Sequence, residues 1–331
     1  MTTPPPTPPP GAGVPAEQAR EALLAVRDEI GKVVVGQDPV VSGLVAALLV
    51  RGHVLLEGVP GVAKTLLVTT LARTLQLRAT RVQFTPDLMP SDVTGQQVLE
   101  PGGGSFRFRE GPVFTNLLIA DEVNRTPPRT QAALLEAMQE RQVSVDGEPR
   151  ALPDPFLVVA TQNPVELEGT YPLPEAQLDR FLFKLVVPYP SREQEREILS
   201  RHDRQADAGS ATGADVAAVA DADHLAVARA AAREVRLEAP VRDYLVDLVR
   251  ATRDAPAVEL GVSPRGAAML LHAAKGWAWL AGRAYVTPDE IKAVAKPTLR
   301  HRLQLRPEVE LEGATADAVL DNLLQTVPAP R

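Results

Sequence analysis

The chain has no cysteine among its 331 residues. This absence excludes disulfide bonds, thiolate metal sites and cysteine nucleophiles, and nothing else in the sequence indicates an oxidising compartment. Long hydrophobic runs are also missing, since none approaches the roughly 20 apolar residues that a membrane-spanning helix requires. The N-terminus lacks the apolar core of a signal peptide. We therefore expect no membrane span and a cytoplasmic location.

Positive charge is in deficit as well. Lysine and arginine number 35 against 42 aspartates and glutamates, for a formal net charge of −7. This balance argues against a protein whose main partner is nucleic acid, so we expect none. The hydrophobic content of 45% and charged content of 23% are ordinary for a globular protein, and the length allows two domains. The proline-rich residues 1–15 are predicted to be a disordered tail.

A glycine-rich turn, GVPGVAKT, lies between a short apolar strand and a predicted helix. This order suits a phosphate cradle, in which turn amides, the positive end of the helix dipole and a lysine surround the phosphates. The hydroxyl of Thr65 would bind a magnesium ion. The predicted nucleotide-binding residues of this turn, which has the Walker A pattern, are Gly58, Val59, Pro60, Gly61, Val62, Ala63, Lys64, Thr65 and Leu66.

Ala63 replaces the second glycine of the general Walker A pattern. Because this position opens a helix, we expect an ordinary negative φ, which alanine adopts freely. The alternative is a plain glycine- and proline-rich turn in which Lys64 is merely solvated. The motif alone does not separate the two, so the rest of the chain must decide.

A second polar site is predicted where the apolar run 117–120 ends in Asp121 and Glu122. A run without alternation is typical of a strand covered on both faces, and open α/β sheets bind ligands at the carboxyl ends of their strands. Asp121 would hold magnesium through water, and Glu122 would polarise the attacking water. Such a pair downstream of a phosphate loop is typical of an ATPase.

Two further sites remain open between a ligand and a local role. Asn163 follows another apolar strand, where its amide would hold the attacking water, unless Asn163-Pro164 is only a turn. Gly36 and Gln37 form a corner upstream of the phosphate loop. They are placed to contact the adenine, or they are a simple connector.

Five apolar strands separated by helices predict a doubly wound parallel sheet with helices on both faces, over residues 16–190. Within it, residues 85–115 are predicted to contain a hairpin, and residues 141–153 a second hairpin with an Asp-Gly turn. Residues 191–331 are predicted to be a helical lid, with a low-information segment at 203–222.

Arg265 is predicted at a position in a helix that is unfavourable for a cation. Ser263 is predicted to cap a helix that begins at Pro264, so Arg265 falls in the first turn, where a cation opposes the helix dipole. This position favours an anionic partner: a nucleotide phosphate or a nearby carboxylate.

Taken together, several segments resemble the MoxR family of AAA+ ATPases: GVPGVAKT, QFTPDLMPSDVTG, GPVFTNLLIADEVNR, TQAALLEAMQERQVSVDG, ATQNP, PLPEAQLDRF and SPRGA. The resemblance spans roughly residues 20–305, and Ala63 agrees with the family's own version of Walker A. It implies an AAA+ sheet of five strands, with residues 85–115 as the helix-2 insert and 141–153 as the pre-sensor-1 hairpin. It also implies Walker B at Asp121 and Glu122, sensor 1 at Asn163, an arginine finger at Arg180 and sensor 2 at Arg265.

The same resemblance implies ATP and Mg²⁺ as cofactors and a homo-oligomeric ring, generally a hexamer. It further implies a partner with a von Willebrand factor A domain and a client protein that is matured or loaded with metal. From the residues alone, Arg180 has a second interpretation as half of a surface ion pair with Asp179.

We expect ATP to bind between the sheet domain and the lid, with Arg265 reaching the nucleotide of its own chain and Arg180 that of a neighbour. Three other classes remain as alternatives: a small-molecule kinase with a phosphate loop, a DNA-directed AAA+ motor, and a nucleotide-binding adaptor without turnover. The intact Asp121-Glu122 pair argues against the adaptor, and the acidic balance argues against the DNA motor.

Overall fold

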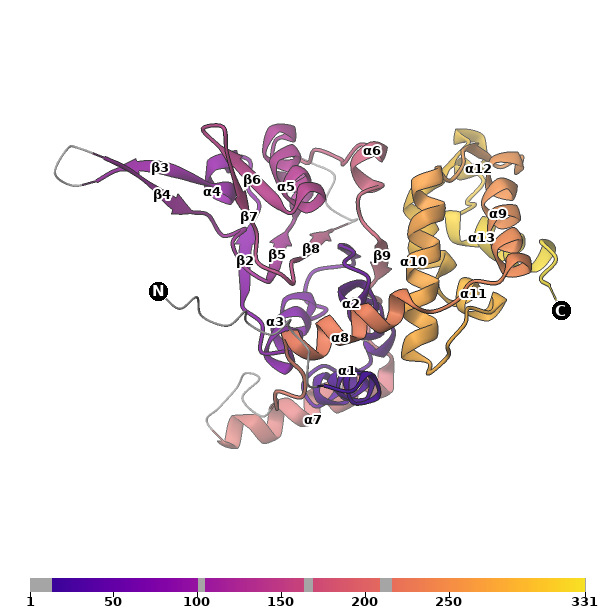
Figure 1. Cartoon of the computed structure of the whole chain (residues 1–331), viewed down its shortest axis with the longest axis horizontal. Helices are drawn as coiled ribbons and strands as arrows, with labels where there is room; N and C mark the ends of the chain where they lie inside the picture. The colour runs from indigo at the N-terminus through magenta and orange to yellow at the C-terminus, as the bar shows by residue number, and fades with distance from the viewer. Residues whose placement is uncertain (1–13, 101–104, 164–168, 209–215, 331) are drawn as a thin grey trace, which may run out of the picture.

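The computed structural model describes residues 14–100, 105–163, 169–208 and 216–330 (Figure 1). Almost all of the predicted N-terminal tail, the turn of the first hairpin and part of segment 203–222 lie outside the described residues. The helices are α1 (Ala16–Gly31), α2 (Asp38–Leu49), α3 (Lys64–Thr74), α4 (Pro90–Thr94), α5 (Pro128–Glu140), α6 (Glu175–Leu178), α7 (Arg192–Ala208), α8 (Ala222–Arg233), α9 (Ala239–Asp254), α10 (Pro264–Leu280), α11 (Pro288–Leu299), α12 (Pro307–Leu311) and α13 (Ala316–Thr326).

The central sheet has five parallel strands in the order β2-β5-β8-β1-β9. Each connection between them contains a helix, as parallel pairing requires. The predicted doubly wound sheet is therefore confirmed. Its strands are β1 (Val54–Glu57), β2 (Ala79–Gln83), β5 (Leu117–Asp121), β8 (Leu157–Gln162) and β9 (Phe183–Val186).

Alternate residues of the central strands face two different apolar cores. Leu117 and Ile119 of β5 pack into one core with α1, α2 and α3, whereas Leu118 and Ala120 pack into another with α5. Because both faces of the sheet are covered, the apolar run 117–120 has no alternation in the sequence. The helix α1 buries Ala19, Leu23, Val26 and Ile30, the positions that its sequence period predicts.

Helix α2 begins at Asp38, and Gln37 occupies the cap position without a side-chain capping bond. Pro39 remains in the first turn, where its missing N–H costs nothing.

Two hairpins project from the sheet domain on the same side (Figure 1). One consists of β3 (Gly95–Leu99) and β4 (Phe106–Glu110), and the other of β6 (Gln142–Val145) and β7 (Glu148–Ala151). The guanidinium of Arg150 lies 4.1 Å from the ring centre of Phe108, so a cation–π contact joins the two hairpins. Asp146 and Gly147 both have positive φ, as the predicted Asp-Gly turn requires.

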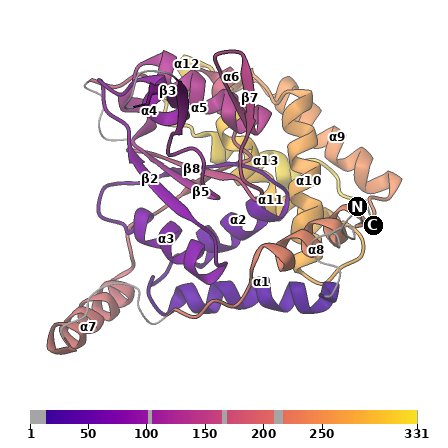
Figure 2. The same ribbon diagram turned by 60° about the vertical axis from the view of Figure 1, so that its left-hand side comes forward.

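The C-terminal region is helical, with a short antiparallel sheet of β10 (Val258–Leu260) and β11 (Gln304–Leu305) added. Helix α8 packs on α1 and α2, while α9, α10, α11 and α13 pack together beside the sheet (Figure 2). The core around α1 and α2 continues into α8 and α10. Among the described helices, none combines the length and apolar content needed to cross a bilayer.

Candidate active site

The glycine-rich turn connects β1 to α3 at the carboxyl edge of the sheet. A Cβ atom on Gly58 would lie 2.7 Å from the carbonyl oxygen of Val187, so only glycine fits against the end of β9. Gly61 has a φ of 85°, a backbone conformation that favours glycine. The first N–H groups of α3 have no intrahelical partners, which leaves donors for an anion at this end.

The prediction of a negative φ at Ala63 is wrong. Ala63 precedes α3 with φ 59° and ψ 24°, in the left-handed region. Since a Cβ atom is strained there, the second glycine of the general pattern would adopt this conformation more easily. The need for positive φ is set by the sharp entry from the loop into the helix, which the helical pattern alone does not reveal.

Lys64 is half-buried and donates a hydrogen bond to the carbonyl oxygen of Gly58 at the start of the loop. Burial lowers the pKa of its ammonium, an effect opposed chiefly by Asp121 and Glu122. The loop thus holds a positive charge within the field of the two predicted acidic residues.

Asp121 ends β5 and is 6% exposed. Its Oδ1 accepts a hydrogen bond from Thr161 Oγ1 at 2.9 Å, and its Oδ2 accepts from Thr65 Oγ1 at 3.3 Å. Arg81 Nε also lies 2.6 Å from Oδ2. The structure therefore brings Thr65 and Asp121 together, with a guanidinium on the same carboxylate oxygen.

Glu122 has a φ of 55°, so its backbone is also left-handed. Its N–H donates to Thr161 Oγ1 at 3.0 Å, and its Oε2 accepts from Gln83 Nε2 at 2.7 Å and from Arg125 Nη1 at 2.9 Å. A strained conformation held by several bonds is typical of a functional position. The carboxylate is fixed at the sheet edge beside Asp121.

Four polar residues of this edge were not predicted: Arg81, Gln83, Arg125 and Thr161. Arg81 and Gln83 occupy alternate positions near the end of β2, and Gln83 pairs in register with Asp121. Arg81 and Gln83 are two residues apart in the sequence TRVQF, so a strand places them on the same face. Their closeness to Asp121 can be predicted only when β2 is known to pair with β5.

Asn163 follows β8, which lies between β5 and β1, and it is buried at the same edge of the sheet. Gly36 has a φ of 76° and precedes Gln37, which is 5% exposed. Gln37 Oε1 is buried and has no hydrogen-bond partner among the described residues. A buried acceptor without a donor fits the exocyclic amine of adenine. The residues present thus suit a nucleotide.

Arg180 and Arg265 lie elsewhere. Both line a cavity of about 210 Å³ together with Arg51, Gly52 and His53, which immediately precede β1. The phosphate loop follows the other end of β1, so the two arginines lie at the opposite edge of the sheet. Arg265 therefore lies away from the phosphate loop of its own chain, because the lid docks against the amino ends of the strands.

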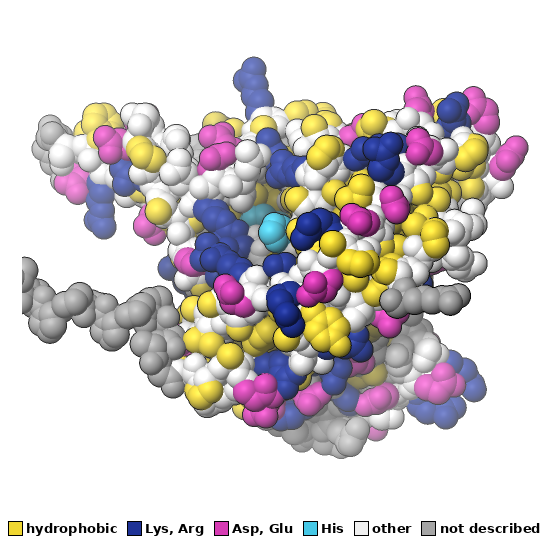
Figure 3. Space-filling model, turned by 45° about the vertical axis from the view of Figure 1, so that its right-hand side comes forward, with side chains coloured by type: hydrophobic (Ala, Val, Ile, Leu, Met, Phe, Trp, Pro, Cys, Tyr) yellow, Lys and Arg dark blue, Asp and Glu magenta, His cyan; other side chains and the backbone are white. Residues whose placement is uncertain are grey.

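This cavity is strongly basic. Among the described residues, its lining includes four arginines and two histidines and no carboxylate: Arg51, Arg141, Arg180, Arg265, His53 and His272, with Val50, Gly52, Met138, Gln139, Leu182 and Met269. Figure 3 shows lysine and arginine side chains gathered around a hollow that holds a histidine. We call this cavity the arginine pocket.

The ion pair between Asp179 and Arg180 does not form. The Asp179 carboxylate accepts from Arg302 Nε at 2.7 Å and from Ser263 Oγ at 3.3 Å. Across the described part of the chain, no carboxylate pairs with Arg180 or Arg265. Ser263 also caps α10, as predicted, and Arg265 is exposed in the first turn of that helix.

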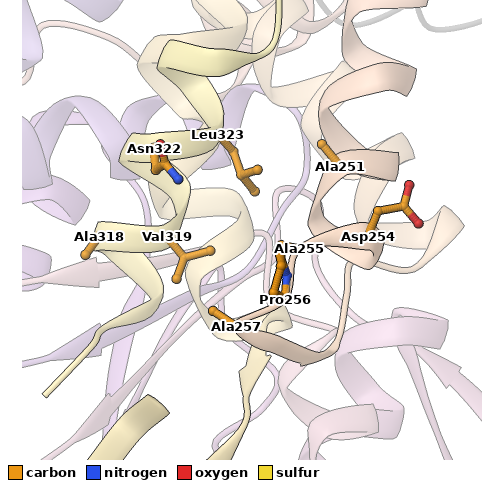
Figure 4. Close-up of a pocket in the computed structure, with 9 residues that line it drawn as sticks. All are labelled: Ala251, Asp254, Ala255, Pro256, Ala257, Ala318, Val319, Asn322 and Leu323. Carbon is orange, nitrogen blue, oxygen red and sulfur yellow. The ribbon is translucent and has the colours of Figure 1, made fainter. Parts of the chain in front are cut away.

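A larger hollow of about 580 Å³ lies in the lid between the end of α9 and α13 (Figure 4). Asp254 is the only charged residue among the described residues that line it, which are otherwise mostly small and apolar. None of the predicted site residues lines it. The hollow therefore does not offer the cationic surroundings that a triphosphate requires.

A parallel sheet with a phosphate loop, a pair of carboxylates at the same edge and a helical lid define an ATPase of the AAA+ class. Residues 53–183 match a model of the ATPase family associated with various cellular activities (AAA), and residues 250–323 match a model of the AAA lid domain.

Comparison with named relatives identifies the family within the AAA+ class. The chain is 44% identical to Chaperone MoxR1 of Mycobacterium tuberculosis, over 92% of this chain and 81% of that protein. It is 35% identical to Protein MoxR of Methylorubrum extorquens, over 94% and 96%. A solved structure from Cytophaga hutchinsonii, described as a candidate ATPase, is 41% identical and has a TM-score of 0.87 over 96% of this chain and 97% of that one. The chain belongs to the MoxR family of AAA+ ATPases.

Proposed function

We propose that this ATPase works as a ring in which every ATP site is shared by two copies of the chain. One copy binds and cuts the triphosphate at the carboxyl edge of its sheet, and the next copy supplies Arg180 and Arg265. The observation that carries the proposal is the arginine pocket, where two arginines without an ion-pair partner among the described residues lie at the sheet edge opposite the phosphate loop of the same chain.

The binding half of the site uses residues 58–66. Loop amides and the N-terminus of α3 bind the phosphates, and Lys64 turns from the Gly58 carbonyl toward them. Gly36 and Gln37 contact the adenine through backbone and the unpaired Oε1. Thr65 and Asp121, which already share a hydrogen bond, would hold Mg²⁺. When bound, Mg²⁺ would neutralise charge on the phosphate oxygens.

Hydrolysis requires a water positioned in line with the outer phosphate. Glu122 accepts a proton from this water once Gln83 and Arg125 release its carboxylate, and Asn163 orients the water with its amide. Thr161 holds Asp121 and the Glu122 backbone at once, so it fixes the acidic pair relative to the loop.

The arginines complete the site from outside. Phosphoryl transfer spreads negative charge over the oxygens of the transferred group, and an arginine from another surface raises the rate by roughly 10³ to 10⁵. Each copy places its phosphate loop against one neighbour and its arginines against the other, so the contact between copies is head-to-tail. Such contacts close into rings, and we propose a hexamer.

Assembly of this kind couples turnover to lid position. Arg265 is carried by α10 of the lid, and Ser263 at the start of α10 bonds to Asp179 beside Arg180. Loss of the outer phosphate removes the anion that both arginines contact and frees the lid to shift between copies. We propose that this shift acts on a client protein to mature it, assemble it or insert its metal or cofactor.

The proposal of a partner protein and a client is based on the family to which the chain belongs. Proteins named MoxR and Chaperone MoxR1 are similar to this chain over most of its length. We propose a von Willebrand factor A domain protein as the partner that presents the client, with the cytoplasm as the place of action. No nucleic-acid partner is proposed, because the net charge is −7.

The rival functions are a DNA-directed AAA+ motor and a small-molecule phosphate-loop kinase. A kinase needs no second copy, so its two unpaired arginines at the far edge of the sheet would have no ligand. Gel filtration with ATP and Mg²⁺ separates the two classes, since a kinase stays small. Hydrolysis stimulated by DNA would favour the motor.

The direct test of the proposal is Arg180→Ala. The variant should bind a fluorescent ATP analogue as the parent does, because Arg180 acts on the charge that develops during phosphoryl transfer, and should lose about 10³-fold of its turnover. Arg242→Ala, which removes an exposed arginine of α9, is the matched control and should leave both unchanged. Full turnover by the Arg180 variant would refute the shared site.

A further inference from the structure

The arginine pocket holds one cation that the proposed function does not use. Of its four arginines, Arg180 and Arg265 are assigned to the neighbour's triphosphate, and Arg51 pairs with Asp154, whose Oδ2 lies 2.7 Å from Arg51 Nη2. Arg141 remains. Among the described residues, no carboxylate lies within ion-pair distance of its guanidinium.

Arg141 has a backbone conformation that few residues with a side chain adopt. It caps the C-terminus of α5 with φ 53° and ψ 28°, in the left-handed region that disfavours side chains. Its Nη2 donates to the carbonyl oxygen of Arg51 at 2.7 Å, and the residue is half-buried. Burial, and then the charge of Arg51, lower the pKa of Arg141. A cation in such surroundings gains from an anionic partner.

Asp154, whose charge raises the pKa of Arg141, forms its ion pairs with two other arginines. Asp154 Oδ1 accepts from Arg229 Nη1 at 2.9 Å, while its Oδ2 accepts from Arg51. Arg229 is buried on α8 and also donates to the Leu48 carbonyl oxygen from Nε at 3.1 Å and from Nη2 at 2.9 Å. Both oxygens of Asp154 are thus occupied, and the segment that bears Arg51 and accepts from Arg141 is held in place.

We propose that Arg141 is a third cation offered to the nucleoside triphosphate of the neighbouring copy, beside Arg180 and Arg265. The inference rests on the proposed function, since it needs a neighbour's nucleotide. Three guanidinium groups arrive from separate elements: the end of α5, the segment after α6 and the first turn of α10. Charge that develops on several phosphate oxygens is matched best by donors from several directions.

The structural alternative is that Arg141 only ties the end of α5 to the segment before β1. Mixing two inactive variants separates these roles. Arg141→Met keeps the apolar stem but removes the charge, and Glu122→Gln removes the predicted general base while keeping every arginine. In a mixed ring, the phosphate loop and intact Glu122 of an Arg141 variant can face the intact Arg141 of a Glu122 variant. In an equal random mixture, about a quarter of the interfaces have both residues intact.

The inference predicts that Arg141→Met binds the fluorescent ATP analogue as the parent does, unfolds at the same temperature within a few degrees and loses about 10- to 100-fold of its turnover. Mixing it with Glu122→Gln should raise the rate well above the sum of the two. Arg141→Lys should keep more turnover than the Met variant, because a point charge remains.

The reference mixture is Arg180→Ala with Glu122→Gln. If this mixture gains activity and the Arg141 mixture does not, Arg141 is structural and the inference falls while the shared site stands. If neither mixture gains activity, the shared site itself fails and the inference with it. Full turnover by Arg141→Met alone also overturns the inference.

Discussion

Arg302 donates from Nε to the Oδ1 of Asp179 at 2.7 Å. This bond joins the lid to the segment that carries Arg180, and it is the reason that Asp179 does not neutralise its own neighbour. The second oxygen of Asp179 accepts from Ser263, which starts the helix that carries Arg265. One carboxylate therefore positions the carriers of both arginines.

Asp179→Asn should weaken the fold and the shared site together. It leaves Arg302, whose side chain is 2% exposed, without its carboxylate, at a cost of about 3 kcal/mol. Urea unfolding measures this loss, and turnover should fall while binding of the fluorescent ATP analogue stays unchanged. Glu175→Gln removes an exposed carboxylate of α6 as a control. Equal stability of the Asp179 variant and the parent would contradict the positioning role.

Arg81→Ala should strengthen binding of Mg²⁺. The Arg81 guanidinium lies 2.6 Å from the Asp121 oxygen that Thr65 also contacts, so it competes with a metal for that carboxylate. Because Arg81 is largely exposed, the gain is modest, about 2- to 5-fold in the Mg²⁺ concentration that half-saturates nucleotide binding. Arg78→Ala, with an exposed arginine before the same strand, is the control. A higher Mg²⁺ requirement would mean that Arg81 helps to hold the nucleotide instead.

Acid should destabilise the protein through His53. Burial lowers the pKa of His53 to about 4, although its hydrogen bond to the Met138 carbonyl opposes this. Its Nδ1 accepts from the Val158 N–H, so the folded state holds the ring neutral. An unfolded histidine binds protons from about pH 6.5 downward, so the stability present above that pH is lost as the pH falls toward 4, by about 2 kcal/mol at pH 5.

His53→Gln should reduce this dependence of unfolding free energy on pH between 7 and 5, measured with urea at each pH. His202→Gln, which changes an exposed histidine, should leave the dependence as in the parent. A parent-like slope in the His53 variant would show that other groups account for the acid sensitivity.

Ala63→Gly should stabilise the chain by roughly 0.5 to 1 kcal/mol, because glycine adopts the φ of 59° without strain. Gly61→Ala should cost about 1 kcal/mol, since its φ of 85° disfavours any side chain even where space is open. Urea unfolding of both variants without nucleotide measures the two effects. Loss of stability in Ala63→Gly would contradict the strain at this position.

Local patterns were enough to predict much of this molecule. The spacing of Ala19, Leu23, Val26 and Ile30 predicts the buried face of α1, and the run ending at Asp121 predicts a strand covered on both sides. These features depend only on period and burial, which the sequence states directly.

Features set by the arrangement of elements could not be read in this way. The strained φ of Ala63 follows from the angle between loop and helix, and the contacts of Arg81 and Gln83 follow from the pairing of β2 with β5. The placement of Arg265 at the far edge of the sheet depends on how the lid docks, for which no local pattern exists.

The central claim is that ATP bound at the phosphate loop of one copy is hydrolysed with the help of Arg180 from another copy. The most direct measurement is the ATPase rate of an equal mixture of Glu122→Gln and Arg180→Ala, each inactive alone. A shared site predicts recovery toward about a quarter of the parent rate, as interfaces form between an intact Glu122 and an intact Arg180. A mixture that stays as inactive as its components, although gel filtration shows mixed rings, would contradict the account.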